Sequence, residues 1–443
     1  MAAIATQVAA CDGEGGGNVK NFWWTSPMAD PKAIAVRMAG GLALGACVVA
    51  SHGQGWPIGF YAQIAPPPAK EPDKPTSEPS APSVPGEAGM PSGQGPTVDA
   101  RGGREGTPAS DPLGHAMVVR DDVLPDEITP ELESAVEHGL AALARFQRPD
   151  GSFGEGQFGG NVAITALAGI AFMADGHIPG RGAYGDNVSK ALEYILANCA
   201  ENGVIAGETA SGPMYGHGFA TLFLGEVYGM LPGGAESMLT ARTHQALVRA
   251  VRLIETTQNE EGGWRYNPLP YDADVSVTIC QVMALRSARN AGLDVSKQVI
   301  EKAVKYVQAC QNPDGGFRYQ MQGGPSLWPR SAAGVATLYY AGNYDDAGIP
   351  RGLKYLEDNA MPGKNGPNSL HYFYGHYYAV QAMFLKGKES WATWWPAIRS
   401  ELLSTQNTDT GVWSDSSVGD AYGTAMALII LQMPKRYLPI YQK

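Results

Sequence analysis

The residues that could do chemistry in this chain gather in six short segments, each just before a stretch of small and apolar residues. The catalytic candidates are Asp272, Asp274, Ser276 and His376. The ligand-binding candidates are Tyr215, His217, Trp328, Arg330, His371, Tyr374, Tyr377, Asp420 and Tyr422. Carboxyl and imidazole groups transfer protons, and aromatic rings hold apolar or cationic groups. Acidic residues are also favoured as helix N-caps, so capping is the competing interpretation for each Asp.

Four copies of one phrase indicate which elements position these residues. Residues 147–153, 258–264, 311–317 and 406–413 each begin with Gln, contain Gly and end on an aromatic residue. Each copy follows an apolar helical pattern and precedes a helical pattern of small residues. The phrase is therefore interpreted as the corner of a helix hairpin. Gly supplies the turn there, and Gln can hydrogen-bond backbone groups left open at helix ends.

Two further units keep this plan without the phrase, with corners at residues 198–203 and 363–366. Hairpins of roughly 45 to 60 residues are comparable to known helical repeats, and six of them can close a ring. The sequence therefore predicts an all-α toroid of six hairpins over residues 127–443, with inner and outer helix rings. All inner helices then start at one end, so the candidate residues converge on the mouth of a central cavity.

The Gln…Gly-x-Trp corner resembles that of the prenyltransferase and squalene cyclase repeat superfamily, over roughly residues 130–440. This resemblance implies the terpenoid cyclase and protein prenyltransferase α/α toroid, with a hydrophobic or isoprenoid small molecule as its ligand. Members of the superfamily include protein prenyltransferase β subunits, triterpene and diterpene cyclases, and non-enzymatic relatives. The fold therefore leaves the reaction open.

Class II terpene cyclases of this superfamily carry Asp-x-Asp-Asp-Thr at the start of an inner helix, where the middle acid protonates an alkene. Aligned on its first Asp, this chain has Asp272-Ala-Asp274-Val-Ser276, which keeps the middle acid and loses its neighbour. Aligned on the helix that follows, it has Asp274-Val-Ser276-Val-Thr278, and a serine takes the donor position. The second alignment is preferred because the apolar spacing of the helix determines which residues reach the cavity. An ordinary serine hydroxyl cannot protonate an alkene.

Protein prenyl transfer, the other reaction that the resemblance implies, needs zinc held by Asp, Cys and His. The stretch around His376 resembles the segment that bears the family's zinc histidine, displaced by one position, and no Asp-x-Cys partner occurs nearby. Zinc and other cofactors are therefore not expected, and neither is a prenyltransferase α subunit. His217 and His376 stand at matching positions of opposed units, although a lone helical histidine is more often structural.

Charge and composition narrow the partners and the number of domains. The formal net charge is −11, the isoelectric point is about 5.3, and no basic run occurs in the repeats. This balance argues against nucleic acid as a partner. Because the repeats claim most of the 443 residues, one large domain is the expected organisation.

The N-terminal third is expected to direct export. Residues 38–50 form a short apolar run behind basic residues, which is typical of a signal peptide. Three outcomes stay open: cleavage after Ala50, lipid attachment at Cys47 in a lipobox-like sequence, and an uncleaved anchor that attaches the protein to the membrane. A start at Met28 would give a signal peptide of ordinary shape. Residues 51–126, rich in Pro, Gly and Ser, are expected to be a disordered linker, so we expect a periplasmic or cell-envelope protein.

Three functional hypotheses follow. The first is an enzyme acting on an isoprenoid, either a cyclase-like isomerase or a prenyltransferase-like transferase with degenerate motifs. The second is an exported toroid that binds a lipid, peptide or glycan, or serves as a scaffold, without catalysis. The third is a polysaccharide lyase or hydrolase that uses paired carboxylates or Arg330.

Overall fold

A computed structural model describes residues 127–207, 212–231 and 237–442 of the protein. The predictions made for residues 1–126, namely the signal-like run, the lipobox and the linker, lie outside the described residues.

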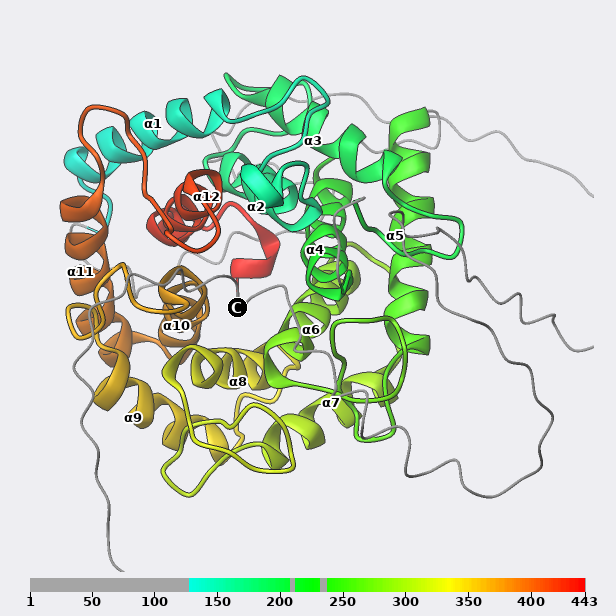
Figure 1. Ribbon diagram of the computed structural model, residues 1–443, viewed down its shortest axis with the longest axis vertical. Helices are drawn as coiled ribbons and strands as arrows, with labels where there is room; N and C mark the ends of the chain where they lie inside the picture. Colours follow the sequence, from blue (N-terminus) through cyan, green and yellow to red (C-terminus); the bar gives the residue numbers. More distant parts are fainter. Residues whose placement is uncertain (1–126, 208–211, 232–236, 443) are drawn as a thin grey trace, which may run out of the picture. The chain divides into compact units, whose positions relative to one another are not determined.

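Twelve α-helices occur in the described part of the chain, and they alternate between an outer and an inner ring (Figure 1). The outer helices are α1 (Pro130–Arg145), α3 (Gly185–Ala197), α5 (Met238–Thr256), α7 (Lys297–Ala309), α9 (Gly348–Ala360) and α11 (Lys388–Thr405). The inner helices are α2 (Val162–Ala174), α4 (Met214–Met230), α6 (Val275–Asn290), α8 (Trp328–Tyr340), α10 (Tyr372–Lys386) and α12 (Asp420–Leu431). A short 3₁₀ turn, η1 (Gly156–Phe158), lies in the first corner. The predicted all-α toroid of six hairpins is confirmed.

The inner ring is closed because each inner helix packs against the next and α12 packs against α2. Small residues allow this close approach. On α2 every residue is buried, and a Cβ added to Gly169 would lie 2.5 Å from the ring of Phe223 on α4. Outer helices bury one face only; on α7 the buried residues are Ala303, Tyr306 and Val307. This division between fully buried and half-buried helices is the pattern that two concentric rings require.

The corner glutamines tie each hairpin to the next. Gln258 Nε2 donates to the carbonyl of Gly262 in its own corner and to that of Val299 on α7, both at 2.8 Å. The other corner glutamines bond the next outer helix in the same way, with acceptors Asn187, Gly348 and Ala135. These acceptors are carbonyls in the first two turns of an outer helix. They are not the carbonyls of a last helical turn, which lack a partner within their own helix. The bond from Gln406 to Ala135 joins the last corner to α1 and completes the circle.

A second repeated bond holds each corner to its inner helix. The backbone N–H of Trp264 donates to Oγ1 of Thr278 at 3.2 Å. In three other corners the donors are Phe153, Phe317 and Trp413, and the acceptors are Thr165, Ser331 and Thr424. Each acceptor is the fourth or fifth residue of its helix. This position on an inner helix therefore faces the corner and not the central cavity.

The C-terminal segment after α12 turns into the ring, a feature that the sequence analysis did not predict (Figure 1). It contains the 3₁₀ turns η2 (Met433–Lys435) and η3 (Pro439–Tyr441), and η3 packs against α6. Leu438, Ile440 and Tyr441 are at most 3% exposed. Protein chain therefore fills the part of the ring where the inner helices end.

Within the described residues, no helix combines the length and apolar character needed to cross a bilayer. The same residues contain no cluster of three or more His, Cys, Asp or Glu side chains that could hold a metal ion.

Candidate functional site

A small aromatic cavity lies where the inner helices begin. Tyr215, Phe219, Tyr374 and Tyr422 line it, together with apolar side chains at the start of α2. The cavity leaves a volume of about 10 Å³ to the centre of a water molecule, so it holds about one water. Three tyrosines from the predicted ligand-binding set therefore converge at the mouth, but the space between them is almost filled.

Asp274 is the buried acid of this end of the toroid. It caps α6, with Oδ1 accepting the N–H of Val277 at 2.9 Å, and its side chain is 0% exposed. Oδ2 is buried, Nε of Arg265 lies 3.8 Å away, and hydrogen bonding with the Tyr319 side chain lowers the pKa of the carboxyl. Burial raises the pKa of this carboxyl to about 7, against the lowering effect of the Val277 N–H and Arg265. Asp274 is both an N-cap and a group that titrates near neutral pH.

Aromatic rings and one guanidinium surround this acid, and three of these residues were missed from the sequence: Arg265, Tyr266 and Tyr319. Cζ of Arg265 lies 5.2 Å from the ring centroid of Tyr266 and 5.7 Å from that of Tyr319. The hydroxyls of the two tyrosines are hydrogen-bonded to each other. Tyr215 and Tyr374 both interact electrostatically with Asp274, which connects the acid to the cavity. An Arg-Tyr pair directly after the corner aromatic of the third and fourth hairpins was the signal available in the sequence.

Asp272 and Ser276, the neighbours of Asp274 in the predicted motif, have different surroundings. The Asp272 side chain is 39% exposed and forms an ion pair with Arg265. Ser276 lies in the first turn of α6, and its carbonyl accepts a hydrogen bond from the Tyr374 hydroxyl at 3.1 Å. Of the three, only Asp274 is an acid removed from water.

Arg330 and His371 lie near the same mouth. Cζ of Arg330 is 5.5 Å from the Tyr319 ring centroid, and burial lowers the pKa of this guanidinium. His371 precedes α10 in the left-handed conformation, with φ of 65°. Burial and the charge of Arg330 lower the pKa of this imidazole to about 4, so it is neutral at neutral pH.

Asp420 and Tyr377 are the remaining predicted residues near the starts of the inner helices. The backbone N–H of Asp420 donates to Oε2 of Glu155 at 2.7 Å, so the first corner caps α12. Tyr377 lies one turn deeper, and its hydroxyl is 3.4 Å from that of Tyr441 in the C-terminal segment. It therefore contacts the segment that fills the ring.

His217 has a structural role. Nδ1 accepts the N–H of Ile205 at 3.2 Å, and Nε2 lies 3.2 Å from the carbonyl of Ala250. It is the fourth residue of α4 and replaces the Thr or Ser that binds the corner in other hairpins. With both nitrogens occupied by backbone groups, the imidazole has none left for a ligand.

His376 is the fifth residue of α10, the position that Thr424 has in α12, and it also lies outside the central cavity. Its ring centroid is 4.6 Å from that of Tyr372, 4.9 Å from Trp328 and 5.9 Å from Trp394 on outer helix α11. Both ring nitrogens are buried without a hydrogen bond to the described residues. His376 and Trp328 were predicted at a ligand site, and the structure places their rings against each other, with Trp394 of the outer ring beside His376.

Opposite stability effects are expected for the two histidines. His217→Leu leaves the buried Ile205 N–H without an acceptor and is expected to lower the free energy of unfolding by about 2 kcal/mol. His376→Leu removes a buried polar ring that has no partner and is expected to leave stability unchanged or raise it. Urea unfolding of both variants measures the difference. Equal losses in the two would contradict these assignments.

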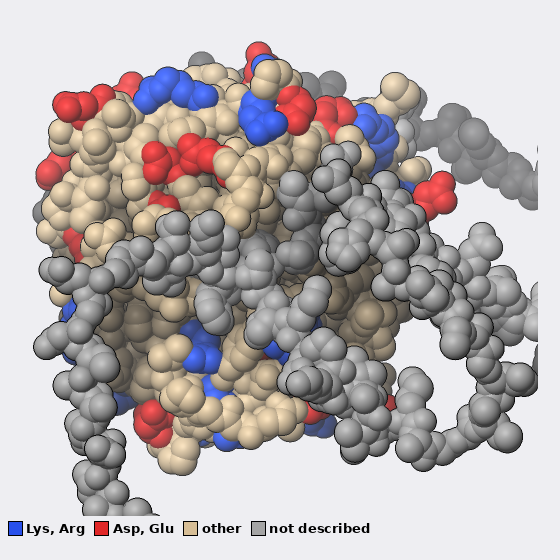
Figure 2. Space-filling model, in the orientation of Figure 1, with Lys and Arg blue, Asp and Glu red and all other residues tan. Residues whose placement is uncertain are grey.

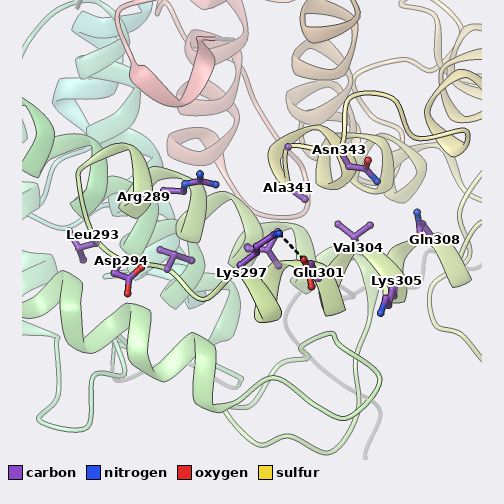
Figure 3. Close-up of a pocket in the computed structure, with 13 residues that line it drawn as sticks. Arg289, Leu293, Asp294, Lys297, Glu301, Val304, Lys305, Gln308, Ala341 and Asn343 are labelled. Atoms are coloured by element: carbon purple, nitrogen blue, oxygen red, sulfur yellow. Dashed lines mark ion pairs between the residues drawn. The ribbon is translucent and has the colours of Figure 1, made fainter. Parts of the chain in front are cut away.

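A larger pocket of about 610 Å³ lies at the outer ring, between α7, the turn before it and the turn after α8 (Figure 3). Leu293, Ile300 and Val304 supply apolar surface, and charged side chains stand at its edges. Lys297 Nζ is 3.4 Å from Glu301 Oε1, and the Lys297 side chain is 90% exposed. These charges are in water, so the pocket lacks the buried titratable group that the mouth has.

On the face shown in Figure 2, Lys and Arg form several small groups with Asp and Glu near them, and they do not merge into one basic patch.

Comparisons with known proteins agree with this architecture. Residues 233–359 match the family described as the prenyltransferase alpha-alpha toroid domain. A stretch of 85 residues is 36% identical to drimenyl diphosphate synthase of Streptantibioticus cattleyicolor, and it covers 19% of this chain and 15% of that protein. The chain therefore aligns with only a small part of that relative.

Two kinds of solved toroid resemble the described helices. The type II terpene cyclase MstE from Scytonema matches with a TM-score of 0.50 and 14% identity, over 70% of this chain and 100% of that chain. A variant of it was solved with its substrate, geranylgeranyl dihydroxybenzoate. An inactive variant of the α-1,6-mannanase GH76A of Salegentibacter sp. HEL1_6, with α-1,6-mannotriose, matches with a TM-score of 0.51 and 9% identity, over 68% of this chain and 98% of that chain.

At these identities the solved structures show the fold alone, which is an α/α toroid. The family match over residues 233–359 agrees with the resemblance that the corner motif indicated.

Proposed function

We propose that this toroid binds an isoprenoid-type molecule at the mouth of its inner ring and that Asp274 exchanges a proton with it. The observation that supports this most directly is the complete burial of the Asp274 carboxyl at the mouth, beside Arg265 and the Tyr319 hydroxyl. The pKa of Asp274, about 7, suits a group that must be a proton donor and then an acceptor near neutral pH. The aromatic lining of the mouth fits an apolar chain.

The proposed reaction is an isomerisation. The neutral Asp274 carboxyl gives its proton to one carbon of an alkene, the π electrons form the new C–H bond, and a carbocation remains on the other carbon. The carboxylate left behind is stabilised by Arg265. The rings of Tyr215, Tyr374 and Tyr422 face the cation. Ring closure followed by return of a proton to the carboxylate restores the acid, so no co-reactant is consumed.

The small volume of the cavity favours a second candidate function, a binding toroid without catalysis. Room for about one water does not hold an isoprenoid chain, so side chains or the C-terminal segment must move for one to enter. A protein that binds a lipid, peptide or glycan at the rim of the mouth would need no such movement.

Asp274→Asn distinguishes these functions. The amide keeps the shape and the acceptor for the Val277 N–H but holds no transferable acidic proton. With geranylgeraniol as substrate and gas chromatography with mass detection of isomers, we expect conversion to fall about 100-fold. Asp272→Asn is the matched control, because that carboxyl is partly exposed, and a loss below about tenfold is expected.

The binding measurement completes this test. If the wild-type protein binds geranylgeraniol, seen by native mass spectrometry, and converts none of it, the isomerase proposal is refuted and the non-catalytic function stands. If it neither binds nor converts geranylgeraniol, squalene or farnesol, the isoprenoid proposal itself is refuted.

We also propose that the protein is exported to the cell envelope, on the strength of the signal-like residues 38–50. N-terminal analysis of the mature protein tests this. A new N-terminus near Ala50, or a lipid-modified Cys47, would support export. An intact N-terminus in a cytosolic fraction would refute it.

A further inference from the structure

Residues 437–442 pack inside the inner ring at a site formed by Glu226 on α4 and Tyr377 on α10, which is called the seat below. Ile440 N–H donates to Oε2 of Glu226 on α4 at 3.2 Å. The hydroxyls of Tyr441 and Tyr377 on α10 are 3.4 Å apart. Just before this segment, Lys435 pairs with Asp175 at the end of α2, and Arg436 pairs with Glu127 at 3.3 Å. The segment thus contacts inner helices on several sides of the ring, and residues 437–442 carry no charged side chain.

We propose that residues 437–442 are an internal plug of the ring and that deprotonation of Glu226 releases it. The plug occupies the part of the ring where the inner helices end, so a ligand chain that reaches from the mouth into the ring competes with it for that space.

The hydrogen bonds around Glu226 accommodate a neutral acid in the closed state. Ser287 Oγ is 2.6 Å from Oε1 of Glu226 and 3.2 Å from the carbonyl of Leu222. A serine hydroxyl has one hydrogen, and it can be given to only one of these oxygens. If Ser287 donates to the Leu222 carbonyl, a protonated Glu226 can donate to Oγ of Ser287 through Oε1. Oε2 of Glu226 still accepts from the N–H of Ile440. The neutral acid therefore satisfies every group at the seat. The carboxylate would also accept from Ser287 and Ile440, but it would be a buried charge without an ion pair among the described residues.

The other groups that face this seat stay neutral around pH 7. They are the hydroxyls of Tyr340 on α8, Tyr377 on α10 and Tyr441 on the plug, and burial raises the pKa of each above its ordinary value. Arg286 on α6 interacts with Tyr340. Glu226 is thus the carboxyl whose charge changes at this seat between pH 5 and 8.

The sign of the pH effect follows from the burial of Glu226, which is 2% exposed in the closed state. Burial raises its pKa from 4.5 to about 7, against the lowering effect of Ser287 and Ile440. Once the plug leaves and water reaches the carboxyl, the pKa returns toward 4.5. The opened state therefore binds fewer protons, the closed state is fully stabilised below about pH 4.5, and this stabilisation is lost as the pH rises to 7.

The experiment is amide hydrogen exchange of the peptide covering residues 437–442 in the full chain, corrected for the intrinsic pH dependence of exchange. From pH 5.5 to pH 8, we expect the opening equilibrium to rise on the order of 20-fold. In Glu226→Gln the amide donates to Ser287 and accepts from Ile440, as the neutral acid does. The pH dependence is expected to disappear in this variant and to persist in the control Glu193→Gln, whose carboxylate is exposed.

An opening equilibrium that is independent of pH, or one with the same pH dependence in Glu226→Gln, would overturn the plug proposal. The competition with ligand rests on the proposed function and has a separate readout, the binding of farnesol at the two pH values. We expect at least tenfold tighter binding at pH 8 than at pH 5.5. If the plug opens and farnesol does not bind, the isoprenoid function is refuted while the plug stands.

Discussion

Replacing Gly262 by alanine is expected to lower the free energy of unfolding by about 4 kcal/mol. Gly262 forms the third corner with φ of 101°, a conformation that disfavours a side chain. An added Cβ would lie 2.3 Å from the carbonyl oxygen of Lys302 on α7, and this backbone atom cannot rotate away. The outer helix must shift, which also disturbs the hydrogen bond from Gln258 to Val299. Urea unfolding of the purified domain measures the loss.

Gly292→Ala is the matched control for this prediction. Gly292 has φ of 91°, but no atom lies within 4 Å of an added Cβ. Only the backbone strain is then present, and we expect a loss of about 1 kcal/mol. Similar losses in both variants would show that backbone conformation alone, and not contact with the next hairpin, explains the glycine.

Trp413→Ala is expected to cost about 4 kcal/mol and to loosen the junction between the first and last hairpins. The indole is 1% exposed, and Nε1 donates to the carbonyl of Leu402 at 2.8 Å. Its ring packs directly on Gly139 of α1, where an added Cβ would lie 2.6 Å from it. Alanine leaves a cavity between α1 and α12. The measurement is urea unfolding, with hydrogen exchange of α1 as a local readout.

Two controls bracket this effect. Trp413→Phe keeps an aromatic ring and loses the indole hydrogen bond, so a smaller loss of about 2 kcal/mol is expected. Tyr271→Ala removes a side chain that is 89% exposed and is expected to change stability by less than about 0.5 kcal/mol. Unchanged protection of α1 in Trp413→Ala would contradict the proposed role at the junction.

The fold was predictable because its information is local and repeated. Each corner phrase carries a turn glycine and an aromatic residue that packs under the corner, and the apolar pattern on either side marks the helices. The partner of each Gln could not be predicted in the same way, since it lies on a neighbouring hairpin, about 40 residues away in three cases and 271 positions away for Gln406.

The candidate site was only partly predictable because polar residues at the start of an inner helix can face either the central cavity or the corner of the hairpin. Asp274 was selected, but the preferred alignment moved attention to Ser276, because nothing local shows that Arg265 and two tyrosines from separate corners surround the acid. His217 and His376 were selected for their matching positions, and both lie outside the central cavity. The C-terminal segment was missed because its contacts are with helices made much earlier in the chain.

The hydrogen bond from Gln406 to Ala135 can form during synthesis only after residue 406 has been added to the chain. These residues are 271 positions apart, a length that a ribosome makes in roughly 15 to 55 seconds. Throughout that interval the first hairpin exposes the apolar side that α12 later covers. The nascent chain therefore depends on protection from aggregation until its last hairpin has been made, and a chain that ends early leaves that surface uncovered for good.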